Sequence, residues 1–144
     1  YNIELKSAPS GDNIQHPEPE LFTRLVFESI NELVPAERII IQSFDPRILQ
    51  FWKLKYPENR LSYLVVSPKE TEKIMEVLGF KPDILSPNFK TLKQKTVDDW
   101  HAMSVKVIPW TVNEKSDMKK VMALGVDGLI TDYPDRYFES TSGK

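Results

Sequence analysis

The sequence predicts an α/β fold built on a parallel sheet. Six short apolar segments alternate with helical or loop crossovers, and no Asn-Gly or similar hairpin signal joins one segment to the next. Residues 38–44 contain three consecutive isoleucines, which is the composition of a strand buried on both faces, as in parallel sheets. The six expected strands are residues 1–6, 38–44, 61–66, 83–87, 105–111 and 126–132.

The first strand and the segment after it carry clear local signals. In residues 1–6, two apolar side chains alternate with two charged ones, which is the period of two that a strand requires. Residues 7–13 are a run of turn formers and predict a loop. Apolar residues then recur at helical spacing between Pro17, which suits a helix entrance, and Pro35, which ends the helix.

The later crossovers have helix signals of their own. Asp45 is placed as an N-cap with proline directly after it. Residues 67–70 form a capping box, residues 96–99 cap a further helix, and residues 113–124 complete the series. The glycines expected to stop two of these helices are Gly79 and Gly125.

Length and composition limit the classes of protein to which this chain can belong. The 144 residues suffice for one domain with its own core, and 40% hydrophobic with 28% charged residues is typical of a folded globular chain. A net charge of −2 without a basic patch argues against nucleic acid as a partner, and no apolar run is long enough for a membrane span. Without cysteine, thiolate catalysis, zinc–thiolate sites and disulfides are excluded, and the cellular compartment stays open.

The parallel sheet is either open or closed into a barrel. An open sheet of the dinucleotide-binding type would need a glycine-rich turn after its first strand, and the chain has only five glycines and no such turn. Six strand–crossover units in this length have the spacing of a (β/α)8 barrel but fall two units short of it.

In such a barrel the active site lies at the carboxyl ends of the strands. Glu4 offers a carboxylate of the kind that binds metal ions, and Lys6, two residues on, offers a cation of the kind that binds phosphate from the same side of the strand. An ion pair on an exposed sheet face is the alternative for these two residues. The other strand ends contribute Ser43, Phe44, Val66, Ser67, Ser86, Pro87, Trp110, Thr111, Asn113, Thr131 and Asp132.

This ring of side chains suits a small, polar, anionic ligand. Several members also have a structural alternative. The alternatives are strand-end stabilisation for Ser43, core packing for Trp110, helix capping for Asn113 and turn capping for Asp132. The histidines are expected outside the ring, His16 as a solvated loop residue and His101 as a surface residue of a helix.

Four motifs stand at residues 2–6 (NIELK), 42–45 (QSFD), 108–113 (IPWTVN) and 125–135 (GVDGLITDYPD). In sequence, order and spacing they resemble consecutive motifs of the glycerophosphodiester phosphodiesterase family. The resemblance extends from residue 1 to residue 137, and the last two motifs together are specific.

The resemblance implies a TIM barrel, the parallel (β/α)8 fold of the phosphodiesterase type, with this chain covering about six of the eight units. Residues 1–137 would form this partial domain and residues 138–144 a flexible tail. The resemblance also implies metal-dependent hydrolysis of glycerophosphodiesters to glycerol 3-phosphate and an alcohol, with Ca²⁺ or Mg²⁺ as the cofactor. The implied site residues are Glu4 as a metal ligand and Lys6, Trp110, Ser43 and Phe44 at the substrate.

The chain departs from the family pattern at its first two units. The family's acid and base are two histidines there, one of them in a His-Arg pair, and two further metal carboxylates come from a Glu-x-Asp motif. None of these is present, and His16 and His101 do not match the histidine positions. We therefore expect the catalytic histidines upstream and no activity from this chain alone. Met103-Ser104 stand where the family commonly has a glycine before its seventh strand, which affects a turn only.

Two other functions stay open. One is a non-catalytic partial barrel that binds or scaffolds, and the other is a lipid-directed phosphodiesterase of the same superfamily, although no amphipathic membrane-docking loop is evident.

The chain starts without Met inside an expected strand, so upstream sequence is expected. With two strands absent, residues 1–6 and 126–132 would have unpaired edges. The expected partners are thus the missing amino-terminal part of the barrel or a second copy, besides the glycerophosphodiester substrate.

Overall fold

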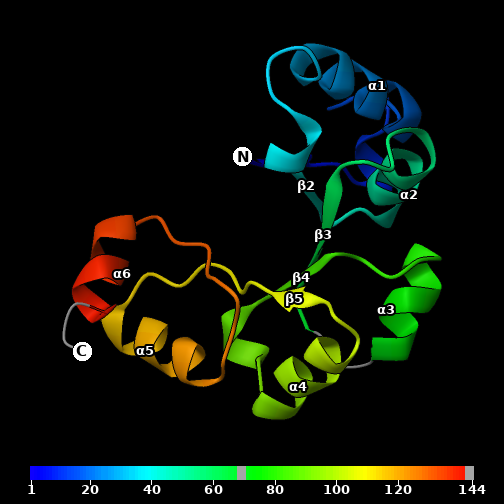
Figure 1. Cartoon of the computed structure of the whole chain (residues 1–144). Helices are drawn as coiled ribbons and strands as arrows, with labels where there is room; N and C mark the ends of the chain where they lie inside the picture. Colours follow the sequence, from blue (N-terminus) through cyan, green and yellow to red (C-terminus); the bar gives the residue numbers. More distant parts are fainter. Residues whose placement is uncertain (68–70, 142–144) are drawn as a thin grey trace. The chain divides into compact units, whose positions relative to one another are not determined.

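The computed structural model describes residues 1–67 and 71–141. They divide into two compact units, which are described separately (Figure 1). Unit 1 comprises residues 1–64 and 72–83, and unit 2 comprises residues 65–71 and 84–144 as far as they are described. The α/β class is confirmed, because strands paired in parallel alternate with helices in both units.

Unit 1 contains three parallel strands in chain order. The strands are β1 (Asn2–Glu4), β2 (Ile40–Ser43) and β3 (Arg60–Val65), whose last residue belongs to unit 2. The helices are α1 (Pro19–Ile30), α2 (Pro46–Lys55) and α3 (Thr71–Leu78), with short 3₁₀ turns at η1 (Pro9–Gly11) and η2 (Ala36–Arg38). Each β1 residue pairs with the β2 residue 38 positions later, so that Glu4 lies opposite Gln42.

The two faces of this sheet differ in character. One face carries Ile41 and Leu61, which are at most 1% exposed, and α2 contacts β2. The other face carries Glu4 and Gln42, because successive residues of a strand point to opposite sides. A buried apolar face and a polar face are therefore built from neighbouring residues of the same strands.

Helices α1 and α2 lie side by side in unit 1 (Figure 1). Trp52 of α2 is fully buried, and its indole N–H donates to Asn59 Oδ1 at 3.0 Å. The Asn59 amide in turn donates to the carbonyl of Ala36 at 3.2 Å. The buried indole thus has the hydrogen-bond partner that a polar atom in a core requires, and Asn59 ties the start of β3 to the segment before β2.

Unit 2 is built on β4 (Ile84–Pro87) and β5 (Lys106–Val107), which pair in parallel. Its helices are α4 (Gln94–Ala102), α5 (Lys115–Ala123) and α6 (Pro134–Thr141), with a 3₁₀ turn at η3 (Phe89–Thr91). Helices α5 and α6 lie side by side (Figure 1). A core cluster of Val112, Met118 and Val121 packs against Leu129 and Tyr137.

The sixth expected strand, residues 126–132, is not a strand in the described structure, so that prediction was wrong. Its backbone nevertheless runs along residues 107–112 through three hydrogen bonds, Asp127 N to Val107 O, Ile130 N to Pro109 O and Val112 N to Ile130 O, at 2.8–2.9 Å. Pro109 has no N–H to donate, which interrupts the ladder and also shortens β5 relative to the expected residues 105–111.

Several helix boundaries also differ from expectation. Helix α4 begins at Gln94, ahead of the expected cap at residues 96–99, and α5 begins at Lys115 with Glu114 in the N-cap position. Helix α6 extends to Thr141, into the range expected as a tail. The expected capping box at residues 67–70 lies largely outside the described residues. Asp45 is confirmed as the N-cap of α2, since its side chain accepts a hydrogen bond from Arg47 N.

Three helices end next to a residue in the left-handed backbone conformation. After α3 and α5 this residue is Gly79 (φ 74°) and Gly125 (φ 78°), as expected of helix stops. After α4 it is Ser104, with φ 58°. A side chain in this conformation is strained by its own Cβ, and glycine is not. Serine at position 104, where the family commonly has a glycine, therefore lowers the stability of the folded chain.

We expect Ser104→Gly to stabilise the protein by about 0.5–1 kcal/mol, because the relief of strain exceeds the added entropy of the unfolded chain. Urea unfolding measures the change. Ser116→Gly is the matched control, since Ser116 lies inside α5, where glycine destabilises by about 0.5–1 kcal/mol. Equal effects of the two substitutions would contradict the strain at Ser104.

Candidate functional site

The carboxyl edge of unit 1 holds the first pair of expected site residues. Glu4 ends β1 and Lys6 follows two residues later, and both side chains are exposed. Among the described residues, neither makes an ion pair with the other. The alternative of an intrastrand ion pair therefore lacks support, and both charges are available to a ligand.

Gln42 lies beside Glu4 and was missed by the sequence analysis. Its side chain is 3% exposed, and its Oε1 accepts a hydrogen bond of 2.6 Å from Asn2 Nδ2. The other amide atom, Nε2, has no hydrogen-bond partner in the described part of the chain. The sequence offers two signals, the QSFD motif and a polar residue directly after three isoleucines, and neither reveals on which face the side chain lies.

Ser43 and Phe44, both expected at the substrate, differ in their surroundings. Ser43 is fully buried, its hydroxyl donates to the Leu5 carbonyl at 2.7 Å, and the same oxygen accepts from Asp45 N at 3.0 Å. Ser43 thus stabilises the strand end, and its contact with substrate stays a prediction. Phe44 is 41% exposed at the end of β2, which leaves much of its ring accessible.

Arg47 of α2 links two carboxylates next to these residues. Its guanidinium donates to Asp45 through Nε and Nη2, with a shortest distance of 2.7 Å, and to Asp12 through Nη1 and Nη2, with a shortest distance of 2.6 Å. The hydrogen bond from Arg47 holds the pKa of Asp12 below 3.8. Burial by itself would raise the pKa of Asp45, but hydrogen bonds from Arg47 and Ser7 outweigh it and lower that pKa as well. Both carboxylates are therefore ionised in the folded protein.

His16 is not the solvated loop residue that the sequence indicated. Its Nε2 accepts from Ala8 N at 3.1 Å, so its Nδ1, 2.8 Å from Pro17 O, carries the proton. A Cβ on Gly11 would lie 2.6 Å from His16 Nε2, so any larger residue there would displace the imidazole. Through these contacts, His16 stabilises the loop between β1 and α1.

Trp110, expected at the substrate mouth, lies in unit 2. Its indole N–H donates to Ser86 O at 2.8 Å, and its backbone forms a bridge with Asn88 after β4. The side chain is half-buried, so part of the indole serves as packing and part of it is accessible. A role at the substrate stays a prediction.

Asn113 does not cap α5, and its side chain hydrogen-bonds to Asp132 instead. Asn113 Nδ2 donates to Asp132 Oδ2 at 2.8 Å, while its Oδ1 accepts from Thr131 Oγ1 and from Asp132 N. One side chain thereby joins the ends of two segments that lie 18–19 residues apart. The expectation that Asn113 caps a helix was wrong because the preferred partners come from the distant segment.

His101 is at the surface as expected, and it is also paired. Its Nε2 lies 2.8 Å from Asp127 Oδ2, and the same carboxylate oxygen accepts from Val107 N at 2.7 Å. Burial alone would raise the pKa of Asp127, but the hydrogen bonds from Val107 and His101 lower it. This pair holds Val107, the last residue of β5, and neither His101 nor Asp127 is among the expected site residues.

A divalent cation fits the described residues in ligand type but not in ligand number. The Glu4 carboxylate is the hard oxygen donor that Ca²⁺ and Mg²⁺ prefer, and these ions take six or more oxygen ligands. The part of the chain that the structure describes has no group of three or more histidine, aspartate or glutamate side chains placed to hold a metal ion. Further ligands would have to be water, substrate or other polypeptide.

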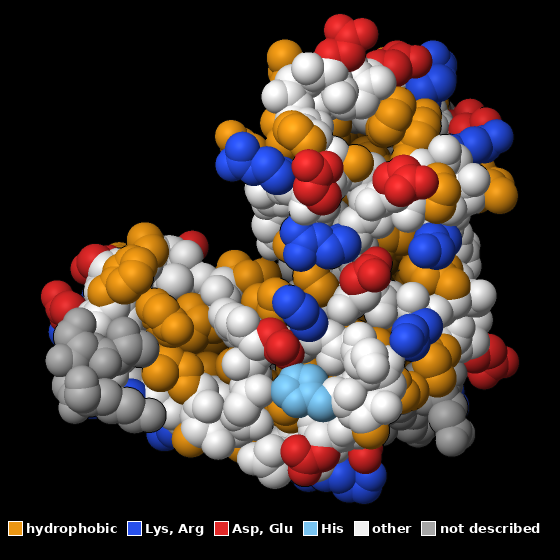
Figure 2. Space-filling model, in the orientation of Figure 1, with side chains coloured by type: hydrophobic (Ala, Val, Ile, Leu, Met, Phe, Trp, Pro, Cys, Tyr) orange, Lys and Arg blue, Asp and Glu red, His pale blue; other side chains and the backbone are white. Residues whose placement is uncertain are grey.

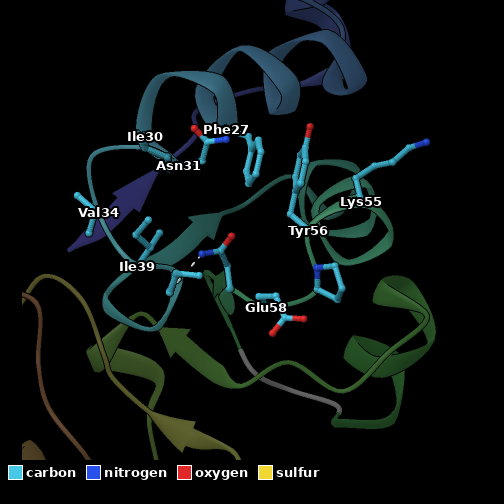
Figure 3. Close-up of a pocket in the computed structure, with 11 residues that line it drawn as sticks. Phe27, Ile30, Asn31, Val34, Ile39, Lys55, Tyr56 and Glu58 are labelled. Carbon is cyan, nitrogen blue, oxygen red and sulfur yellow. Dashed lines mark hydrogen bonds between the residues drawn. The ribbon is translucent and has the colours of Figure 1, made fainter.

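Unit 1 also contains an apolar pocket of about 320 Å³ (Figure 3). Ile30, Val34 and Ile39 line it together with the rings of Phe27 and Tyr56, which face each other with centroids 3.6 Å apart. Ile39 directly precedes β2, so the pocket lies at the amino edge of the sheet, opposite the edge of Glu4 and Lys6. It is therefore not part of the candidate site.

On the face shown in Figure 2, lysine and arginine side chains are interspersed with aspartate and glutamate and do not gather in one basic patch. None of the described helices has the length and apolar composition needed to cross a bilayer.

Comparisons with known proteins agree with the motifs. The model of the "Glycerophosphoryl diester phosphodiesterase family" matches residues 1–136. A curated glycerophosphodiester phosphodiesterase from Caldanaerobacter subterraneus subsp. tengcongensis is 31% identical over 138 residues, which are 93% of this chain and 52% of the relative. The chain thus spans about half the length of the curated relatives it matches.

Solved structures share the fold. A glycerophosphodiester phosphodiesterase from Parabacteroides distasonis matches with a TM-score of 0.75 and 25% identity, over 96% of this chain and 55% of that one. A phosphodiesterase from Oleispira antarctica, solved with its product sn-glycerol-3-phosphate, matches with a TM-score of 0.83 and 23% identity, over 99% and 55% of the two chains.

The paired carboxylates at Arg47 lead to a pH prediction. Folding lowers the pKa values of Asp12 and Asp45 from 3.8, so their contribution to stability is full above that pH and is lost as the pH falls through the folded-state values. We expect the loss of unfolding free energy in Arg47→Gln to be largest near neutral pH and to shrink in acid. Urea unfolding at a series of pH values down to about 2 measures it.

Arg24→Gln is the control for this series. Arg24 pairs with Glu28 on the exposed face of α1, with both side chains more than half exposed, and such pairs contribute about 0–1 kcal/mol. A destabilisation by Arg47→Gln that stays constant throughout the acid range would contradict the lowered pKa values.

Proposed function

Because this chain belongs to the glycerophosphoryl diester phosphodiesterase family, we propose that it forms part of an enzyme that hydrolyses glycerophosphodiesters. Water and a glycerophosphodiester would yield glycerol 3-phosphate and an alcohol. The family match over residues 1–136 carries this proposal. The placement of Glu4 and Lys6 at one strand end supports it, because a phosphodiester needs positive charge and metal-binding oxygen at the same place.

Two side chains of unit 1 have distinct roles in the proposal. The Lys6 ammonium binds a non-bridging oxygen of the phosphate as a point charge. Glu4 provides one oxygen ligand to a divalent cation, Ca²⁺ or Mg²⁺, and the cation when bound would neutralise charge on the phosphate. Phe44, with its partly exposed ring, and Ser43 at the same strand end contribute to the substrate side. A substrate contact of Trp110 is proposed on its match to the IPWTVN motif alone.

No residue of this chain is assigned as the acid or the base. In the described structure His16 braces a loop and His101 pairs with Asp127, so both imidazoles already have structural partners. The catalytic histidines are proposed to lie outside this chain, and the chain by itself is then inactive. A non-catalytic binding module remains the competing proposal, and a lipid-directed phosphodiesterase is distinguished by its substrate.

Release of sn-glycerol 3-phosphate by the full-length protein tests the proposal. We expect hydrolysis of a water-soluble glycerophosphodiester in the presence of Ca²⁺ or Mg²⁺, and Glu4→Gln should raise the cation concentration needed for half-maximal rate by at least about tenfold, equivalent to about 1.4 kcal/mol. A coupled dehydrogenase assay measures the product.

Glu76→Gln is the matched control, because Glu76 is exposed on α3 and lies outside the candidate site. Unchanged rates of Glu4→Gln at limiting calcium would refute the role of Glu4. Absence of product release with either cation would favour the binding module, and release from lysophospholipids alone would favour the lipid-directed enzyme.

The exposed edge of β1 supports a proposal about partners. Among the described strands, β1 pairs with β2 alone, and an unpaired strand edge favours association. We expect the isolated 144-residue chain to self-associate, or to bind the remainder of a barrel, rather than remain monomeric. Light scattering after gel filtration measures its mass, and a stable, monodisperse monomer would contradict this proposal.

A further inference from the structure

Lys6 lies beyond the last residue of β1, where the ladder with β2 no longer supports the chain. Its side chain is long and flexible, so the position of its ammonium depends on how firmly the backbone beside it is held. The structure shows that both neighbours of Lys6 are tied to the segment that leads into α2.

The residue before Lys6 is held through its backbone. The Leu5 N–H donates to Gln42 O at 2.8 Å, and the Leu5 carbonyl accepts from the buried hydroxyl of Ser43 at 2.7 Å. The residue after Lys6 is held through its side chain, because Ser7 Oγ donates to Asp45 Oδ2 at 2.9 Å. Lys6 is therefore fixed on both sides.

The buried Asp45 carboxylate is in turn stabilised and oriented by Arg47. The Asp45 side chain is 3% exposed, and a buried carboxylate is costly unless it is paired and hydrogen-bonded. Arg47 meets both of its oxygens with a planar fork, at 3.0 Å from Nε to Oδ1 and 2.7 Å from Nη2 to Oδ2. The remaining guanidinium N–H groups hold Asp12 at 2.6 and 3.1 Å, which fastens the far end of the same loop.

We propose that Arg47 is a positioning residue for the phosphate contact. It orients Asp45, Asp45 holds Ser7, and Ser7 with Ser43 fixes the backbone that carries Lys6. The proposal rests on the proposed function, in which Lys6 binds the phosphate. Among the described residues, the Arg47 guanidinium donates to the carboxylates of Asp45 and Asp12. A lysine cannot replace it because an ammonium lacks the bidentate fork.

The test is a double-mutant cycle in the full-length protein, with sn-glycerol 3-phosphate as the probe and calorimetry as the measurement. We expect Arg47→Gln to weaken binding about fivefold and Lys6→Met to weaken it as well. Because Arg47 acts through Lys6, the double variant should bind no more weakly than Lys6→Met alone. Arg47→Lys should not restore affinity.

Controls separate positioning from folding. Arg24→Gln removes an arginine from the exposed face of α1 and should leave binding unchanged. Ser7→Ala breaks one link with little risk to folding, and it should weaken binding in the presence of Lys6 and have no effect in Lys6→Met.

The possible failures are distinct. If Lys6→Met weakens binding but Arg47→Gln and Ser7→Ala do not, or if their losses add to that of Lys6→Met, Arg47 is structural only and the positioning proposal is overturned. If Lys6→Met binds as tightly as wild type, the assignment of Lys6 under the proposed function is wrong, and the role of Arg47 falls with it.

Discussion

The parallel pairing of β1 with β2 is the constraint on which the arrangement of unit 1 depends. Its register sets Glu4 opposite Gln42 and leaves Ser43 on the other face of the sheet. A shift by one residue would exchange the faces, burying charge and exposing isoleucine. The register is further secured by side chains, since Asn2 binds Gln42 and Ser43 binds the Leu5 carbonyl.

A second contact recurs in both units, where an aspartate binds both backbone groups of a residue in an earlier strand. Asp83 accepts from Leu61 N and donates its own N–H to Leu61 O, and Asp127 does the same with Val107. Each aspartate thus pairs both the N–H and the C=O of one strand residue. Such groups would otherwise be left unpaired at a cost of about 1–3 kcal/mol each.

The motifs that identify the family have a structural explanation in unit 2. Asn113 of the IPWTVN motif hydrogen-bonds to Thr131 and Asp132 of the GVDGLITDYPD motif, so side-chain hydrogen bonds join the two motifs. Arg136 reinforces this connection by donating to the Asn113 carbonyl at 2.9 Å. Much of what makes these motifs specific thus serves to join two chain segments.

The sequence alone predicted the α/β class, the positions of five strands, the cap at Asp45 and the two charged residues, Glu4 and Lys6, at the end of the first strand. These depend on neighbours within a few residues, where periodicity and turn chemistry act. It did not reveal the failure of residues 126–132 to form a strand, because the proline that interrupts the ladder lies in the partner segment.

Tertiary packing selects which polar residues hydrogen-bond to one another. Arg47 and Asp12 are 35 residues apart, Asn113 and Asp132 are 19 apart, and Gln42 was placed beside Glu4 by the register of two strands. Local sequence cannot specify such contacts, because a side chain with several possible hydrogen-bond partners is assigned to one of them by the packing of distant segments.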